Sequence, residues 1–331
     1  MFYFQYHFLE NCNLRCTHCY QHDWAKEMPD NNYLQSVVGE MEKALVKWNF
    51  EGRISLTGGE PFLYPEKLFY LIDSLENSEP FKWIGILTNG TLITEESAVK
   101  LSQYKKIKEI QISLDGADET THDNIRGLGS FRKAIEAIEL LKRNNIFTSI
   151  MFTLHNQNKH DAVEILKLAN SLNVDAITVE RVTPEQNDTS DLMIAPSELK
   201  NIFKEILDYK KSISGKNKLK IRLSRPLWAL ISEEDGGFCP AGYSCLTILH
   251  NGTVLPCRRL EVPIGNILED GLFKIWYTNP VLWKLRNKSH LQGKCNDCNL
   301  IEKCGGCRSV AYAMTGDIMS EDPQCWKMNN K

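Results

Sequence analysis

Short apolar strands alternate with amphipathic helices through the first part of the chain, and this alternation limits the possible folds more than any other feature. Apolar β-type runs occur at 1–9, 53–56, 83–87, 109–114, 148–154 and 176–182. Apolar residues at helical spacing predict helices at 33–49, 65–76, 94–104, 130–144 and 161–172. Strands separated by helices pair in parallel, so we expect an α/β fold whose sheet is buried on both faces. Six such units are fewer than the eight of a complete barrel.

Polar and glycine-rich motifs directly follow four of these strands. Cysteines follow the first strand, Gly58-Gly59-Glu60-Pro61 follows the second, Asn89 follows the third, and Ser113 and Asp115 close the fourth. In parallel βα folds the reactive groups lie at the carboxyl ends of the strands. The shared position predicts that these motifs form one site.

Three cysteines after the first strand, Cys12, Cys16 and Cys19, are close enough in sequence to bind one metal centre. A structural zinc site needs four ligands, and a disulfide needs two. A cluster of four irons held by three thiolates keeps one iron with an open coordination position. Because an open position can bind a reactant, the spacing alone predicts a metal centre with one free site.

The spacing Cys12-x3-Cys16-x2-Cys19 after a first strand resembles the signature of the radical S-adenosylmethionine (SAM) enzymes. The resemblance implies a [4Fe–4S] cluster whose open iron binds the amine and carboxylate of SAM. One electron then cleaves the sulfonium and gives a 5′-deoxyadenosyl radical. The family folds as a partial (β/α)6 barrel, which fits the number of units in this chain.

The same resemblance implies SAM contacts at the ends of the second and third strands. Gly58, Gly59, Glu60 and Pro61 match the family's amine-binding motif, in which the carboxylate of Glu60 accepts a hydrogen bond from an ammonium group. Taken alone, this motif is more typical of an ordinary turn. Asn89 follows the next strand, so it is also expected to contact SAM.

Further SAM contacts are implied near the fourth strand and in the cysteine loop. Ser113 and Arg126 resemble the residues that hold the SAM carboxylate and ribose, and Asp115 lies beside them at the strand end. A charge on a surface loop is the alternative interpretation of Arg126. His18 lies where the family usually has a tyrosine or phenylalanine against the adenine.

A second group of cysteines lies between 239 and 325. Its members are Cys239, Cys245, Cys257, Cys295, Cys298, Cys304, Cys307 and Cys325. Four thiols within 295–307 are too many for core packing, and two zinc ribbons are possible from spacing alone. Asn251-Gly252 between β-type runs predicts a two-residue hairpin that brings Cys257 within one residue of register with Cys245.

This arrangement resembles the SPASM extension of radical SAM enzymes, which holds two auxiliary [4Fe–4S] clusters. The resemblance implies that Cys239, Cys245, Cys257 and Cys307 ligate the first, and that Cys295, Cys298, Cys304 and Cys325 ligate the second. The three ligand sets together use all eleven cysteines. No thiol then remains to donate a hydrogen atom, which counts against an epimerase of that kind. Full ligation favours electron transfer by the auxiliary clusters.

The change in pattern after residue 185 divides the chain. We expect a radical SAM partial-barrel domain at 1–210, and a linker followed by the cysteine-rich SPASM domain at 211–331. The basic, glycine- and serine-containing stretch 210–220 is interpreted as the solvated linker. Short helices are predicted at 272–276 and 281–286, next to the hairpin.

Composition excludes several classes of protein. The formal net charge of −3 gives no overall basic surface for nucleic acid. No apolar run reaches the length of a membrane span, and the apolar N-terminus lacks the features of a signal peptide. Eleven cysteines without an export signal predict a cytoplasmic protein with reduced thiols.

The family resemblance implies a peptide or protein side chain as the substrate, which would be cross-linked or oxidised. Sulfatase-maturing relatives typically carry an aspartate after the third cysteine of the first auxiliary site, whereas this chain has Arg258 and Arg259 after Cys257. That arginine pair could bind a carboxylate or an acidic peptide, or form a salt bridge within the domain.

Two other functions remain open. The enzyme could mature a haem-type tetrapyrrole or a small redox cofactor, or the chain could be an iron–sulfur electron carrier or scaffold without radical chemistry. The family resemblance implies a flavodoxin or ferredoxin as electron donor. The leader of a peptide substrate is expected to be recognised by a separate leader-binding protein or by another surface, because only eleven residues precede Cys12.

Overall fold

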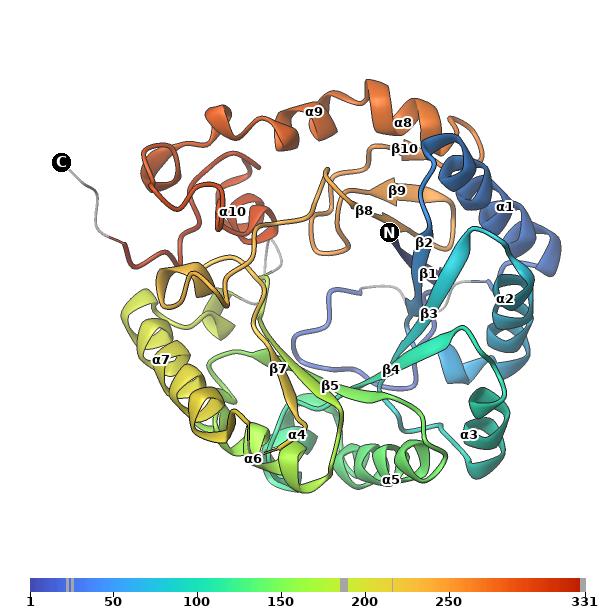
Figure 1. The fold of residues 1–331 in the computed structure, drawn as a ribbon, viewed down its shortest axis with the longest axis horizontal. Coiled ribbons are helices and arrows are strands. Elements are labelled where there is room, and N and C mark those ends of the chain that lie inside the picture. The colour runs from blue at the N-terminus through green and yellow to red at the C-terminus, as the bar shows by residue number, and fades with distance from the viewer. Residues whose placement is uncertain (22–23, 25–26, 185–189, 216, 328–331) are drawn as a thin grey trace.

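A ten-stranded sheet forms the centre of the protein in the computed structural model, which describes residues 1–21, 24, 27–184, 190–215 and 217–327. The strand order is β10-β9-β8-β1-β2-β3-β4-β5-β6-β7. The first seven strands are parallel: β1 (Phe2–Leu9), β2 (Gly52–Gly58), β3 (Phe81–Thr88), β4 (Ile107–Ser113), β5 (Thr148–Leu154), β6 (Ala176–Arg181) and β7 (Lys220–Arg222). The sheet curves and carries its helices on the outside (Figure 1). The predicted α/β partial barrel is confirmed.

The helices follow the strands in the predicted alternation. They are α1 (Asn31–Trp48), α2 (Pro65–Asn77), α3 (Glu95–Ser102), α4 (Glu119–Arg126), α5 (Ser130–Arg143), α6 (Glu164–Ser171), α7 (Pro196–Ile213), α8 (Leu272–Thr278), α9 (Pro280–Arg286) and α10 (Arg308–Thr315). Helix α4 was not predicted, because it has few apolar residues. It starts at the N-cap Asp118, whose side chain accepts from the Thr121 amide.

The two faces of the sheet differ in burial. Outward residues of β1, such as Phe4, are fully buried and pack against aromatic residues including Trp48 of α1. Inward residues in the middle of strands, such as Gln5, Gln111 and Met151, are only partly buried. The expectation that both faces are buried therefore holds for the outer face, while the inner face borders accessible space.

The sheet continues past residue 210, where we predicted the first domain to end. Strand β7 pairs in parallel with β6, and β8 (Cys245–Ile248) pairs in parallel with β1 on the other side. β9 (Thr253–Leu255) and β10 (Gly265–Asn266) follow β8. Part of the predicted linker is helical, because α7 extends to Ile213. The cysteine-rich segment thus adds strands to the barrel sheet.

The hairpin between β8 and β9 has a longer loop than predicted. Thr247 pairs with Leu255, and the Leu249 amide bonds to the Thr253 carbonyl at 2.9 Å. Three residues, ending in Gly252 with φ of +82°, therefore make the turn, and the two-residue prediction is wrong. The observed register, continued past β9, sets Cys245 opposite Cys257 without the predicted offset of one residue.

Membrane-spanning helices are missing from the part of the chain that the structure describes, since no helix there is both long and apolar enough.

Candidate active site

Two glycines join the end of β2 to the start of the cysteine loop. Gly58 has φ of +146°, and a Cβ atom there would lie 2.1 Å from the Leu9 carbonyl oxygen. A Cβ atom on Gly59 would lie 2.0 Å from the Asn11 carbonyl oxygen. In turn, the Gly59 amide donates to Leu9 O at 3.1 Å, and the Glu60 amide donates to Asn11 O at 2.9 Å. Only glycine, which lacks a Cβ atom, lets the backbone at these two positions come so close to the cysteine loop.

The Glu60 carboxylate is fully buried and connects the ends of β2 and β3. It accepts hydrogen bonds from Thr88 Oγ1 at 2.7 Å, the Asn89 amide at 2.8 Å and the Phe62 amide at 3.0 Å. Burial raises the pKa of Glu60 above its ordinary value, although these hydrogen bonds oppose the shift. The carboxylate therefore has a structural role here, and its expected contact with an ammonium group stays a prediction. Pro61 follows in a short 3₁₀ turn.

Asn89 links the end of β3 to the cysteine loop. Its Nδ2 donates to Asn13 Oδ1 at 3.0 Å and lies 4.0 Å from Cys12 Sγ. Its Oδ1 accepts from the Thr91 amide at 2.9 Å. The Leu14 amide also points at Cys12 Sγ, at 3.5 Å. These N–H groups face the sulfur that the sequence identified as a metal ligand.

Asp115 and Arg126 form a buried ion pair beside the cysteine loop. Asp115 Oδ2 lies 2.6 Å from Arg126 Nε, and Arg126 Nη1 lies 3.7 Å from Cys16 Sγ. Burial alone would raise the pKa of Asp115, but the positive charge of Arg126 brings it below its ordinary value. With 8 % of its surface exposed, Arg126 is not a charge on a surface loop. Ser113 lies at the end of β4 in register with Met151.

His18 packs against the same carboxylate. Its Nε2 lies 3.4 Å from Asp115 Oδ2, and its ring centroid lies 5.4 Å from that of His155. Burial lowers the pKa of His18 to about 4, against the attraction of Asp115. The imidazole is therefore neutral at physiological pH.

Three residues that the sequence analysis missed complete this network. His122 Nδ1 accepts from the Asp115 amide at 3.1 Å. Asn158 Nδ2 donates to the Asp115 carbonyl at 3.0 Å, and its Oδ1 accepts from the His155 amide at 2.8 Å. His155 and Asn158 follow the end of β5 just as Asn89 follows β3. The strand-end rule would have found them, but we applied it only to the first four strands.

The three thiols of the cysteine loop fit a cluster held by thiolates. Burial raises the pKa of Cys12, Cys16 and Cys19, the last to about 11. Charge on Cys16 also raises the pKa of Cys12, and charge on Cys16 and Cys12 raises that of Cys19, which places the three sulfurs in one neighbourhood. Because a bound metal deprotonates its thiol ligands, iron would supply the cation that buried thiolates need.

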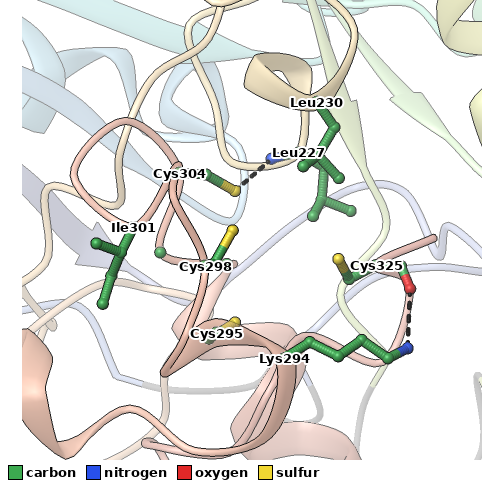
Figure 2. Close-up of a pocket in the computed structure, with 10 residues that line it drawn as sticks. Leu227, Leu230, Lys294, Cys295, Cys298, Ile301, Cys304 and Cys325 are labelled. Atoms are coloured by element: carbon green, nitrogen blue, oxygen red, sulfur yellow. Dashed lines mark hydrogen bonds between the residues drawn. The ribbon is translucent and has the colours of Figure 1, made fainter. Parts of the chain in front are cut away.

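Four further thiols line one pocket. Figure 2 shows the side chains of Cys295, Cys298, Cys304 and Cys325 around a common space that Leu227 and Leu230 close on one side. The Leu227 amide donates to Cys304 Sγ at 3.2 Å, and Lys327 Nζ lies 3.5 Å from Cys298 Sγ. The structure brings together the same four cysteines that the sequence grouped in the second auxiliary set.

The other four thiols also lie within electrostatic range of one another. Burial raises the pKa of Cys239 to about 12, with further contributions from Cys307 and Cys257. The pKa of Cys245 is raised by burial and then by Cys257 and Cys239. These are the members of the first auxiliary set.

All eleven cysteines are free thiols, so none is held in a disulfide. Sets of four thiolates are ligands both of iron–sulfur clusters and of structural zinc.

The arginine pair after Cys257 takes part in salt bridges within the protein. Arg258 Nη1 lies 2.5 Å from Glu261, and its guanidinium lies 4.3 Å from the centre of the Tyr20 ring. Arg259 pairs with Glu180 of β6. Of the two alternatives drawn from the sequence, the internal salt bridge is present.

Comparison with known proteins agrees with this arrangement. The model of the radical SAM superfamily matches residues 6–169, and that of the SPASM iron–sulfur cluster-binding domain matches residues 239–299. The chain is 29 % identical over 340 residues to the AdoMet-dependent heme synthase of Methanosarcina barkeri, covering 95 % of this chain and 93 % of that protein. It is 25 % identical over 327 residues to the mycofactocin maturase MftC of Mycobacterium tuberculosis, covering 95 % and 80 %.

Solved structures share the fold. SuiB of Streptococcus suis bound to its precursor peptide SuiA gives a TM-score of 0.78 at 18 % identity, covering 98 % of this chain and 76 % of that one. Native anSMEcpe with bound AdoMet gives a TM-score of 0.78 at 21 % identity, covering 98 % of this chain and 93 % of that one.

The fold and the two matched domains define an enzyme of the radical SAM class. The chain belongs to the SPASM subgroup of the radical SAM superfamily. The two domains imply [4Fe–4S] clusters and S-adenosylmethionine as its cofactors.

Proposed function

We propose that the protein cleaves SAM reductively at a cluster held by Cys12, Cys16 and Cys19 and oxidises a substrate next to the inner face of the sheet. The observation that carries this proposal is the convergence of the cysteine loop with the ends of β2, β3 and β4. Glu60, Asn89 and Arg126 tie those ends to the loop. When bound, the cluster and SAM supply a 5′-deoxyadenosyl radical that abstracts a hydrogen atom.

The chain's own side chains position SAM in this proposal. Arg126 uses its Nε for Asp115 and turns Nη1 toward Cys16, and its guanidinium carries further N–H donors that suit a carboxylate. Gly58, Gly59, Glu60 and Pro61 form the proposed amine side of the site, with Asn89, Ser113 and Asp115 beside them. Neutral His18 provides a flat ring for the adenine.

The two sets of four thiols are proposed to hold the auxiliary clusters. Cys239, Cys245, Cys257 and Cys307 would ligate the first, and Cys295, Cys298, Cys304 and Cys325 the second. Because each set supplies four sulfurs, neither cluster keeps an open iron for the substrate. We therefore assign them to electron transfer. A flavodoxin or ferredoxin remains the proposed donor.

A haem-type tetrapyrrole is the substrate class that we propose first. The heme synthases match nearly the full length of both chains, as the Methanosarcina barkeri protein illustrates. The ends of the sheet also offer little edge for an added peptide strand, since β7 has three residues and β10 has two.

A peptide or protein side chain is the second candidate. MftC is a relative that is named as a maturase, and the SuiB structure contains a precursor peptide. Under this alternative a leader peptide would be recognised by a separate protein.

The test is anaerobic reconstitution followed by iron analysis and a SAM cleavage assay. Three cubane clusters predict about 12 irons per chain. The Cys12/Cys16/Cys19→Ala variant is expected to lose about four irons and all formation of 5′-deoxyadenosine. Mass spectrometry of reactions with a tetrapyrrole or a peptide then decides the substrate. Full iron without SAM cleavage by the wild type would leave an electron carrier or scaffold as the function.

A further inference from the structure

Two arginines share one glutamate on the inner face of the sheet. Glu180 lies at the end of β6, in register with Thr153 of β5. One of its oxygens accepts from Arg225 Nε, and the other pairs with Arg259 Nη2. Glu180 is buried, whereas 43 % of the Arg225 side chain and 27 % of the Arg259 side chain are exposed. Both arginine side chains therefore reach accessible space in part.

The group carries one unbalanced positive charge. Burial alone would raise the pKa of Glu180, but Arg225 and Arg259 lower it to about 2, so the carboxylate is ionised. One negative charge faces two positive charges. The neighbouring Arg258 does not offset this positive charge, because it is itself a cation and pairs with Glu261. Glu180 alone therefore balances only one of the two arginines, so a further anion can pair with the group.

Backbone contacts hold the two guanidinium groups in place. Arg259 Nη1 donates to the Arg181 carbonyl at 3.3 Å, and Arg225 Nη1 donates to the Ser224 carbonyl at 3.1 Å. A guanidinium has five N–H donors, so both groups can still offer donors to a ligand. Because they are already oriented, binding costs less conformational entropy.

The group lies between the cysteine loop and the first auxiliary set. Arg259 follows Cys257 of that set by two residues. The guanidinium of its neighbour Arg258 lies 4.3 Å from the centre of the ring of Tyr20, which follows Cys19. A substrate anchored here would lie beside the site of radical formation.

We propose that Arg225 and Arg259, held together by Glu180, bind a carboxylate of the substrate. Arginine binds carboxylates through paired, charge-assisted hydrogen bonds. The carboxylate is assigned to a propionate of a haem-type tetrapyrrole, and this assignment rests on the substrate class proposed above. This arginine clamp, formed by Arg225 and Arg259 on Glu180, anchors the propionate and takes no part in the hydrogen abstraction.

The test measures binding of haem with free propionates and of haem dimethyl ester to the reconstituted protein, by absorbance titration. Arg225→Gln and Arg259→Gln are expected to weaken haem binding about 10- to 100-fold, the range of a hydrogen bond to a charged group. They are not expected to weaken binding of the ester further. Arg259→Lys keeps the charge and is expected to lose less affinity than Arg259→Gln.

Arg222→Gln is the matched control. Arg222 also lies on the inner face, but it is balanced one-to-one by Glu109 at 2.6 Å. The Arg222→Gln variant should bind haem as the wild type does. Each test variant leaves Glu180 with one arginine, so folding should survive, and iron content with thermal unfolding checks this.

The outcomes separate this proposal from the proposed function. Wild type that prefers haem over its ester, with unchanged affinity in both glutamine variants, would overturn the clamp and leave the substrate class intact. Equal binding of haem and ester by the wild type would overturn carboxylate recognition. Binding of neither form would remove the tetrapyrrole class, and the clamp with it, without affecting SAM cleavage.

Discussion

Arg126 connects the acidic centre of the site to the cysteine loop: its Nε lies 2.6 Å from Asp115 Oδ2 and its Nη1 lies 3.7 Å from Cys16 Sγ. Asp115 fixes the guanidinium by an ion pair, and the guanidinium in turn points at a proposed cluster ligand. One buried arginine thus serves both the fold and the proposed cofactor site.

Replacing Arg126 should change the properties of the N-terminal cluster alone. Arg126→Gln removes a positive charge close to Cys16, and a reduced cluster is more negative than an oxidised one. Its reduction potential is therefore expected to fall, and about 60 mV corresponds to a tenfold change for one electron. SAM should also bind more weakly. Redox titration monitored by electron paramagnetic resonance measures the shift, and unchanged potential together with unchanged SAM affinity would contradict it.

The closeness of Gly59 to Asn11 predicts a selective loss of iron. Gly59→Ala places a Cβ atom about 2.0 Å from a carbonyl oxygen, so the cysteine loop must move. We expect a loss of about four irons per chain while about eight remain. Iron analysis of the reconstituted variant checks this.

Gly39 in α1 provides the control for that substitution. A Cβ atom there meets nothing within 4 Å. Gly39→Ala should keep all iron and raise the free energy of unfolding by up to about 1 kcal/mol, because alanine favours helices. Equal iron loss in both variants would mean that the loop does not depend on the contact at Gly59.

Pairs of cysteine substitutions can test the interleaved ligand sets. Cys304 and Cys325 line one pocket, whereas Cys245 lies with Cys239 and Cys257. The Cys304/Cys325→Ala double variant should lose about four irons, and the Cys245/Cys325→Ala double variant about eight. Iron analysis with Mössbauer spectroscopy gives the counts. A loss of four in both cases would place all three cysteines in one set.

Much of the site could be predicted from the sequence because of the strand-end rule, which places reactive groups at the carboxyl ends of parallel strands. Parallel strands end at one edge, so Glu60 and Asn89 meet although 29 residues separate them. The rule says nothing about which atoms pair. In the structure the Glu60 carboxylate accepts hydrogen bonds from backbone amides and from Thr88, and local sequence does not reveal these partners.

Other features depended on contacts that no local pattern encodes. The partner of Arg259 is Glu180, far away in sequence, so the choice between substrate binding and a salt bridge required the structure. Strand β7 has only three residues and gives no period to detect. The hairpin loop was misjudged because Gly252 takes a positive φ, which suits a three-residue loop as well as a two-residue one.

His122 should make stability depend on pH. Burial lowers its pKa from 6.5 to about 4, with Arg126 adding to the shift, and its Nδ1 must stay unprotonated to accept from the Asp115 amide. Between about pH 6.5 and about pH 4 the unfolded chain binds a proton that the native protein excludes. Stability therefore falls as the pH falls through this range, by up to about 1.4 kcal/mol per pH unit for each such group.

His122→Gln keeps an acceptor and removes the titration. Its free energy of unfolding should depend less steeply on pH than that of the wild type, with a slope lower by about one proton. His18, whose pKa is also lowered to about 4, still titrates in this variant, so some pH dependence remains. Urea unfolding under anaerobic conditions at several pH values measures the slopes. His160→Gln, at a side chain that is 63 % exposed, is the control for the loss of a histidine. If the slopes of wild type and His122→Gln were the same, protonation of His122 would not be linked to unfolding.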